Sequence, residues 1–218
     1  MRDPAGTVGE LLAEQARRGG SIVLTGGSTP GKAYERAAQR EADWGRVTLW
    51  WGDERCVPPD DERSNFRLAR ETLLDRLGAA PLSVHRIRGE LEPAEAAAEY
   101  DAALEGVELD LLLLGLGSDG HMASLFPGSP QLDVDDRRAT WGPPGLDPFV
   151  DRVTLTLPSL LAASRIVFLV TGEGKADAVA RAFGSEVSRA VPASLTRLAA
   201  ATVEVVLDAA AAAGLKQT

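Results

Sequence analysis

The 218-residue sequence lacks several features that mark particular classes of protein. Its single cysteine, Cys56, excludes an intramolecular disulfide framework and a cysteine-rich zinc site. No hydrophobic run reaches the roughly 18–20 residues that a membrane-spanning helix needs. Residues 1–20 contain no apolar segment of the kind that secretory signal peptides carry. These absences predict a cytoplasmic protein with no membrane partner.

Positive charge is also scarce. Lys and Arg number 23 against 32 Asp and Glu, which gives a formal net charge of −9. This balance argues against nucleic acid as a partner, because nucleic-acid binders carry basic patches. It leaves room for a small anionic substrate, since a pocket can be positive in a protein that is negative overall. The length and the ordinary apolar and charged content predict one globular domain, residues 1–218.

Short apolar runs alternate with helical patterns along the chain. The predicted strands are 21–25, 47–51, 84–87, 109–114, 153–157, 166–170 and 203–207. The predicted helices are 8–17, 30–41, 66–77, 93–104, 175–183 and 209–215. This alternation predicts an α/β fold with a mostly parallel sheet. Residues 127–151, rich in Pro, Gly and Asp, are predicted to form a long loop, either a lid or a solvated surface excursion.

The first predicted strand is followed by the segment Gly26-Gly27-Ser28-Thr29-Pro30 and then by a helix. In a parallel sheet, ligands bind beyond the carboxyl ends of the strands. The glycines allow close approach, and the N–H groups of a helix start attract anions. Ser28 or Thr29 is expected to cap the helix, so the segment is either an anion site or merely a well-capped start. An ATP or GTP loop is disfavoured, because Ala33 stands where the magnesium-binding hydroxyl belongs.

A second glycine-rich turn, Gly115 to His121, follows the apolar strand 109–114. It matches the spacing of a dinucleotide fingerprint, but Pro127 interrupts the helix that such a fingerprint requires. A nicotinamide cofactor is therefore not expected. The turn instead presents Asp119 and His121, and histidine suits proton transfer near neutral pH. The other histidine, His85, is predicted to be structural.

Charged side chains stand at two further strand ends. Asp53, Glu54 and Arg55 follow strand 47–51, and Arg55 is expected either to bind phosphate or to pair with one of the two carboxylates. Lys175 begins the helix after strand 166–170, where the helix dipole disfavours a cation. A bound anion would explain that placement, and a solvated lysine is the alternative.

Taken together and in this order, these motifs resemble the 6-phosphogluconolactonase family. The matching stretches lie between Ser21 and about Ser194 and read LTGGSTP, WGDERCVPPDDERSN, VHRIRGEL, LDLLLLGLGSDGHMASLFPGSP, DRVTLTLPSL and VTGEGKA. The resemblance implies a doubly wound, NagB-like fold, shared with glucosamine-6-phosphate deaminases. It implies hydrolysis of the lactone ring of 6-phosphoglucono-1,5-lactone in the oxidative pentose phosphate pathway, with no metal and no organic cofactor.

Site residues follow from the same resemblance. It makes His121, in the Asp119-Gly120-His121 motif, the base that activates water. From the chemistry of the reaction we expect Asp119 to orient the His121 ring. The resemblance makes the remaining matched residues contacts to the phosphate or to the rest of the substrate: Gly26, Gly27, Ser28, Thr29, Arg55, Lys175 and Arg152. The partner is a sugar-phosphate lactone, and we expect a monomer, with a dimer left open. The G-x-S-x-G elbow of serine hydrolases is absent, so no covalent serine is expected.

Two alternatives share the predicted fold. A glucosamine-6-phosphate deaminase carries a carboxylate shortly after its DGH motif, whereas the segment 122–127 here has none. A non-catalytic sugar-phosphate sensor usually accompanies a DNA-binding segment, and the stretch before Ser21 is too short and too weakly basic for one. The family usually has a strand and a long helix before its GGSTP motif. The sequence is therefore predicted to be short at the N-terminus, with one helix before Ser21.

Overall fold

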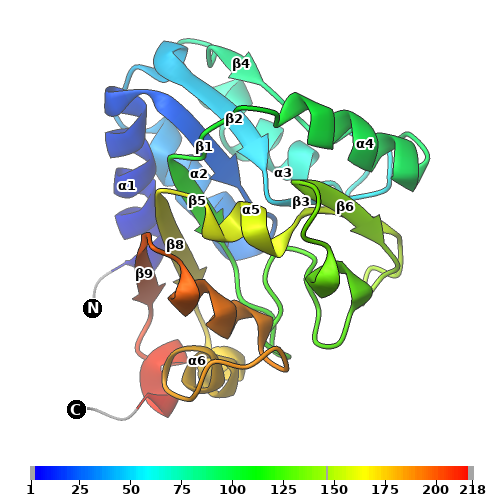
Figure 1. Cartoon of the computed structure of the whole chain (residues 1–218). Helices are drawn as coiled ribbons and strands as arrows, with labels where there is room; N and C mark the ends of the chain where they lie inside the picture. Colours follow the sequence, from blue (N-terminus) through cyan, green and yellow to red (C-terminus); the bar gives the residue numbers. More distant parts are fainter. Residues whose placement is uncertain (1–2, 146, 216–218) are drawn as a thin grey trace.

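The computed structural model describes residues 3–145 and 147–215, and a six-stranded parallel sheet forms its centre (Figure 1). The strand order is β4-β2-β1-β5-β8-β9. These strands are β1 (Gly20–Leu24), β2 (Val47–Trp51), β4 (Ser83–Val84), β5 (Leu111–Leu114), β8 (Arg165–Val170) and β9 (Thr202–Leu207). Strands β1, β2, β5 and β8 are almost wholly buried, as expected where helices cover both faces of a parallel sheet.

The helices fall into two groups. In the first group, α2 (Ser28–Ala38) packs against both α1 (Pro4–Arg18) and α3 (Asn65–Thr72), and α1 also contacts β1, β8 and β9. The second group is α4 (Pro93–Ala103), α5 (Leu157–Leu161) and α6 (Ala176–Phe183). Right-handed crossovers place helices on opposite faces when the chain moves in opposite directions along a sheet. The predicted doubly wound α/β fold is therefore confirmed.

The chain reverses its direction along the sheet at β1. From β1 it moves through α2 to β2 and then to β4, whereas β5, β8 and β9 lie on the other side of β1. Ligands of doubly wound sheets bind in the crevice at such a switch point, beyond the carboxyl ends of the strands. The segments that follow β1 and β5 therefore face the expected binding crevice.

A second, three-stranded antiparallel sheet was not anticipated from the sequence. It has the order β3-β7-β6 and consists of β3 (Asp53–Arg55), β7 (Arg152–Leu155) and β6 (Ala139–Gly142). The strand expected at 153–157 is present as β7, but it belongs to this second sheet. The prediction of a long loop over 127–151 was wrong in part, because this stretch contains η3 and β6. Strands β3 and β6 are only three and four residues long, and β3 is entirely charged, so neither of these two shows a hydrophobic pattern. Their pairing comes from the backbone ladder between β3 and β7 and between β7 and β6.

Several element boundaries differ from the predictions. The helix expected at 66–77 breaks after Thr72 into a separate 3₁₀ turn, and the strand expected at 84–87 ends at Val84. The helix before β1 begins at Pro4, and the segment 209–215 holds only a 3₁₀ turn. The 3₁₀ turns are η1 (Trp44–Arg46), η2 (Leu74–Arg76), η3 (Pro130–Asp133), η4 (Glu173–Lys175), η5 (Pro192–Leu198) and η6 (Ala211–Gly214).

Two buried tyrosines attach helices to the carboxyl edge of the parallel sheet. The hydroxyl of Tyr34, in α2, accepts from the N–H of Thr25 at 2.8 Å and donates to the carbonyl of Thr25 at 2.6 Å. Tyr100, in α4, makes the same pair of bonds to Trp51, at 2.8 and 2.9 Å. Burial raises the pKa of both phenols, so they stay protonated and keep donating. Thr25 and Trp51 are thereby fixed at the carboxyl ends of the neighbouring strands β1 and β2.

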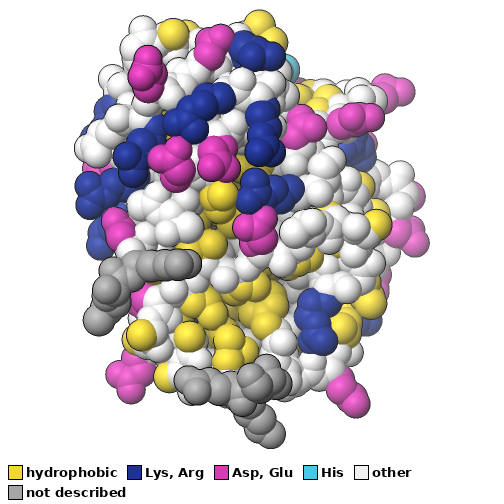
Figure 2. All heavy atoms as spheres, turned by 90° about the vertical axis from the view of Figure 1, so that its left-hand side faces the viewer, with side chains coloured by type: hydrophobic (Ala, Val, Ile, Leu, Met, Phe, Trp, Pro, Cys, Tyr) yellow, Lys and Arg dark blue, Asp and Glu magenta, His cyan; other side chains and the backbone are white. Residues whose placement is uncertain are grey.

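The surface over α1 carries mixed charge despite the overall balance of −9. Figure 2 shows Lys and Arg side chains interspersed with Asp and Glu over the upper half of this face. Arg17 and Arg40 both pair with Glu10 there, each at 3.1 Å. Among the described residues, no helix has the length and apolar character that crossing a membrane requires. The cytoplasmic location and the monomeric state stay predictions.

The Tyr34 bridge gives a stability prediction. Tyr34→Phe leaves the buried N–H and carbonyl of Thr25 without their partner, which costs about 1–3 kcal/mol of unfolding free energy. Urea denaturation measures this loss. Thr7→Ala, which removes an exposed hydroxyl on α1, is the control and is expected to cost under about 0.5 kcal/mol. Equal stability of Tyr34→Phe and the wild type would show that the bridge does not stabilise the sheet edge.

Candidate active site

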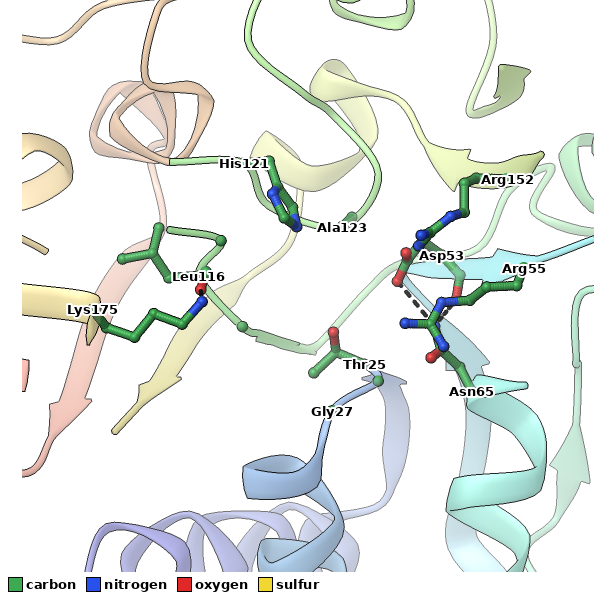
Figure 3. A pocket seen from close by; sticks show the side chains of 13 residues that line it. Thr25, Gly27, Asp53, Arg55, Asn65, Leu116, His121, Ala123, Arg152 and Lys175 are labelled. Atoms are coloured by element: carbon green, nitrogen blue, oxygen red, sulfur yellow. Dashed lines mark hydrogen bonds between the residues drawn. The ribbon is translucent and has the colours of Figure 1, made fainter. Parts of the chain in front are cut away.

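A cavity of about 180 Å³ lies at the switch point, beyond the carboxyl ends of β1 and β5. Side chains from both sheets and from several loops surround it (Figure 3). Its lining consists of Thr25, Gly26, Gly27, Asp53, Arg55, Asn65, Gly115, Leu116, Gly117, His121, Ala123, Arg152 and Lys175. Four of these, Arg55, His121, Arg152 and Lys175, have side chains that can carry positive charge, and they come from four separate segments of the chain.

His121 lines the cavity and is held by Asp119. The ring Nδ1 lies 2.6 Å from Oδ1 of Asp119, and the same oxygen accepts from the backbone N–H of His121 at 3.1 Å. Burial raises the pKa of Asp119, but the bonds from His121 outweigh it and hold that pKa below its usual value. An ionised Asp119 favours the tautomer with the proton on Nδ1, which leaves Nε2 as a proton acceptor.

The turn that carries His121 depends on two glycines. A Cβ on Gly117 would lie 2.0 Å from Nδ1 of His121, so only glycine lets the ring fold back over the turn. Gly120 has a φ of +96°, in the left-handed region that glycine tolerates. The ring of Phe126 packs against the His121 ring with centroids 4.5 Å apart. Backbone geometry and ring packing together fix where the imidazole lies.

Lys175 approaches the cavity beside the N-terminus of α2. Its Nζ donates to the carbonyl of Leu116 at 2.7 Å, and burial lowers its pKa although Asp119 opposes this. The hydroxyls of Thr29 and Thr171 lie 2.9 Å apart and join the start of α2 to the loop that leads to Lys175. A lysine next to the first amides of an 11-residue helix is an arrangement that binds anions.

The predicted caps of this helix were wrong. Gly27, not Ser28 or Thr29, is the N-cap of α2, and no side chain caps it. The hydroxyl of Thr29 is directed to Thr171 instead. The first amides of α2 therefore have no side-chain oxygen from the cap residue, as suits a site whose acceptor is a ligand.

Arg55 and Arg152 lie directly opposite each other on β3 and β7. Like charges at such a position repel, and burial together with Arg55 lowers the pKa of Arg152, against the opposing effect of Asp53. The Arg55 guanidinium donates to the carbonyl of Arg63, and Nη2 of Arg152 donates to the carbonyl of Pro148 at 3.0 Å. Arg55 thus does not pair with Asp53 or Glu54 in the way that the sequence left open. Figure 3 shows the two arginines on one side of the cavity, Lys175 on the other, and His121 between them.

Asp53 and Asn65 are site residues that the sequence did not single out. Asp53 is 5% exposed and accepts from Oγ of Ser124 at 2.7 Å and from Nδ2 of Asn65 at 3.2 Å. Within the described part of the chain, Nε of Arg55 and Oδ1 of Asn65 are among the buried side-chain atoms with no hydrogen-bond partner, and both residues line the cavity. One of these atoms is a donor and the other is an acceptor. In the sequence, Asp53 and Asn65 lie in the polar segments WGDER and RSN, which show no hydrophobic periodicity.

Glu54 ties β3 to the start of α3. Its carboxylate accepts from the backbone N–H groups of Asn65 and Phe66, both at 2.7 Å, and from Oγ of Ser64 at 3.0 Å. Burial raises the pKa of Glu54, and these hydrogen bonds, together with one from the Arg55 amide, oppose that rise. Glu54 accepts hydrogen bonds from the backbone amides of both Asn65 and Arg55, and it therefore fixes the positions of these two cavity-lining residues.

The structure brings most of the predicted site residues together. Gly26, Gly27, Arg55, Lys175, Arg152 and His121 all line the cavity, whereas Ser28, Thr29 and Asp119 are neighbours of lining residues along the chain. His85 lies elsewhere, stacked on Trp50 with ring centroids 4.0 Å apart, in line with a structural role. Over residues 3–145 and 147–215, no three His, Cys, Asp or Glu side chains are grouped so as to hold a metal ion.

Known proteins resemble this chain along most of its length. Residues 5–206 match the family model described as glucosamine-6-phosphate isomerases/6-phosphogluconolactonase. A 6-phosphogluconolactonase from Synechocystis is 40% identical over 187 residues, covering 81% of this chain and 76% of the relative.

Solved structures also resemble this chain along most of its length. A 6-phosphogluconolactonase from Thermotoga maritima superposes with a TM-score of 0.81 at 31% identity, covering 95% of this chain and 97% of that one. A monomeric glucosamine-6-phosphate deaminase superposes with a TM-score of 0.86 at 19% identity, covering 97% and 95%, which shows a shared fold. The chain therefore belongs to the family of glucosamine-6-phosphate isomerases and 6-phosphogluconolactonases.

Proposed function

We propose that the protein hydrolyses 6-phosphoglucono-1,5-lactone to 6-phosphogluconate. The observation that carries this proposal is the Asp119–His121 pair in a cavity with cations on two opposite sides. Relatives that are 34–40% identical and carry the name 6-phosphogluconolactonase support it. The apolar continuation after His121, with Met122 and Leu125 buried, also favours a lactonase over a deaminase, which would place a carboxylate nearby.

The phosphate group fits the side of the cavity formed by Lys175 and the N-terminus of α2. A phosphate there would accept from the amides of Ser28 and Thr29 and from the ammonium of Lys175. Gly26 and Gly27 let the ligand approach the backbone. Anchoring this remote group lets binding energy hold the lactone carbonyl beside His121.

The lactone end of the substrate then lies between His121 and the two arginines. Nε2 of His121 takes a proton from water, and the water oxygen attacks the lactone carbonyl carbon. The resulting tetrahedral intermediate collapses with cleavage of the bond to the ring oxygen, which takes the proton back from the imidazolium. A positioned acid–base group of this kind contributes about 10²–10⁴-fold to the rate.

In this scheme, Arg55 and Arg152 stabilise the negative charge of the tetrahedral intermediate. The negative charge that develops on the carbonyl oxygen would relieve the repulsion between two opposed guanidinium groups. The unpartnered Nε of Arg55 and Oδ1 of Asn65 would bond the carbonyl oxygen and a ring hydroxyl of the sugar. The cavity would thus favour a polyhydroxylated lactone over a simple ester.

The substrate assignment predicts a difference between two lactones. The purified protein should accelerate hydrolysis of 6-phosphogluconolactone well above the spontaneous rate, and that of unphosphorylated gluconolactone far less. A pH-stat or a coupled assay with spontaneous hydrolysis subtracted measures both rates. No acceleration of either lactone would contradict the proposed reaction, and equal acceleration would contradict phosphate anchoring.

The base assignment predicts a selective loss in His121→Ala. We expect kcat to fall about 10²–10⁴-fold while the fold is kept, because the proton acceptor is gone. The matched control is His85→Asn, which alters the only other histidine and should leave kcat within about twofold. Near-full turnover by a folded His121→Ala protein would show that another group activates the water.

The anchor assignment predicts a loss that depends on the phosphate. Lys175→Met should lower kcat/KM for the phosphorylated lactone about 10-fold to 100-fold, the worth of one hydrogen bond to a charged group. The unphosphorylated lactone should be almost unaffected. Lys32→Met is the control. It removes an exposed lysine from α2, the helix whose N-terminus lies at the proposed phosphate site, and it should change neither rate.

The pH dependence of product binding tests the role of Lys175 in a second way. Burial lowers the pKa of Lys175, so its positive charge is lost at a lower pH than that of a free lysine. Calorimetric affinity for 6-phosphogluconate should therefore weaken at alkaline pH in the wild type and show no such weakening in Lys175→Met. A loss of the same size in both proteins would rule out Lys175 as the anchor.

A further inference from the structure

We propose that Arg181 is a positioning residue that holds the Asp119–His121 turn in its working geometry. Arg181 lies on α6, is half-buried and does not line the cavity. Its guanidinium bonds to the backbone of the turn. The inference rests on the proposed function, because it concerns the same histidine.

The guanidinium spans two consecutive carbonyl groups of the turn. Nη2 of Arg181 donates to the carbonyl of Ser118 at 2.8 Å, and Nη1 donates to the carbonyl of Asp119 at 3.2 Å. Nε donates to Oδ2 of Asp177, one helical turn earlier, at 2.8 Å. All three nitrogens are therefore engaged, and the planar fork has only one orientation that satisfies them.

Lys175 holds the other end of the same turn. Its Nζ donates to the carbonyl of Leu116, so η4 and α6 together bind three of the four carbonyls between Leu116 and Asp119. The turn needs such support for two reasons. Ser118 is exposed, and Gly117 and Gly120 have no side chain to limit their backbone conformation. Lys175 must also serve an anionic ligand in our scheme, whereas Arg181 serves only the turn.

The orientation of these peptide groups determines how Asp119 meets His121. Oδ1 of Asp119 accepts from both Nδ1 and the backbone N–H of His121, so a small rotation of the 118–119 peptide weakens both bonds. Without the clamp, the Asp119 carboxylate no longer selects the Nδ1–H tautomer. The fraction of His121 with a free Nε2 acceptor then falls, and kcat falls with it.

The test compares Arg181→Ala, Arg181→Lys and the control Arg197→Ala. Arg197 is an exposed arginine that also donates to a backbone carbonyl, that of Ser185, beyond the end of α6. We would measure kcat and KM with 6-phosphogluconolactone, the melting temperature, and the imidazole ¹⁵N shifts of the ligand-free protein. The chain has two histidines, so His85→Asn assigns the spectrum.

Arg181→Ala is expected to lower kcat about 10-fold to 100-fold with KM within about twofold, the size of effect that a misplaced catalytic group produces. Its melting temperature should fall by no more than about 4 °C, and the His121 ¹⁵N shifts should move toward a mixture of tautomers. Arg181→Lys should be intermediate, because an ammonium lacks the fork, and Arg197→Ala should match the wild type.

Unchanged kcat and His121 shifts in Arg181→Ala would overturn the proposal. A fall in kcat that accompanies a large drop in melting temperature, with His121 shifts unchanged, would overturn it too, since that pattern marks a general structural role. The ¹⁵N measurement needs no substrate. An inactive wild-type protein would therefore contradict the proposed function while leaving the positioning role to be decided by the spectrum.

Discussion

The site is organised by two adjacent carboxylates, Asp53 and Glu54, that are buried at the end of strand β2. They are 5% and 3% exposed, and a buried carboxylate is costly unless hydrogen bonds satisfy it. Glu54 is satisfied by the first amides of α3, and Asp53 by Asn65 and Ser124. These hydrogen bonds hold the start of α3 and the segment after His121 next to Asp53 and Glu54. Residues of all three segments line the cavity.

The charge of the cavity differs from that of the whole molecule. In a protein of net charge −9, Lys175 stands on one side of the cavity and Arg55 and Arg152 on the other. Each of the three donates a hydrogen bond to a backbone carbonyl. The acidic exterior would repel polyanions while the cavity attracts a small one. This arrangement selects for size as well as for charge.

The sequence allowed much of this to be predicted, and the reasons for success and failure are physical. The parallel sheet was evident because β1, β2, β5 and β8 are continuous apolar runs, and the turns after β1 and β5 could then be placed at one edge. The second sheet could not be predicted, because β3 is the charged triplet 53–55 and forms only where β7 supplies its backbone partner.

Other residues in and around the candidate site could not be predicted for the same reason. Asn65 and Ser124 follow no periodic pattern and gain their importance from contacts with Asp53, which lies 12 and 71 positions away along the chain. Arg181 lies on a helix face that looks like ordinary solvated surface in the sequence, with Asp177 as its i,i+4 partner. Only the fold shows that its guanidinium reaches the Ser118 and Asp119 carbonyls.

In the proposed reaction, the phosphate is bound beside Lys175 and the start of α2, so that the lactone carbonyl lies at His121. A crystal structure with bound 6-phosphogluconate would test this placement. We expect the phosphate oxygens within hydrogen-bond distance of Nζ of Lys175 and the Thr29 amide, and the new carboxylate next to Nε2 of His121. A phosphate seated between Arg55 and Arg152, with the carboxylate away from His121, would contradict it.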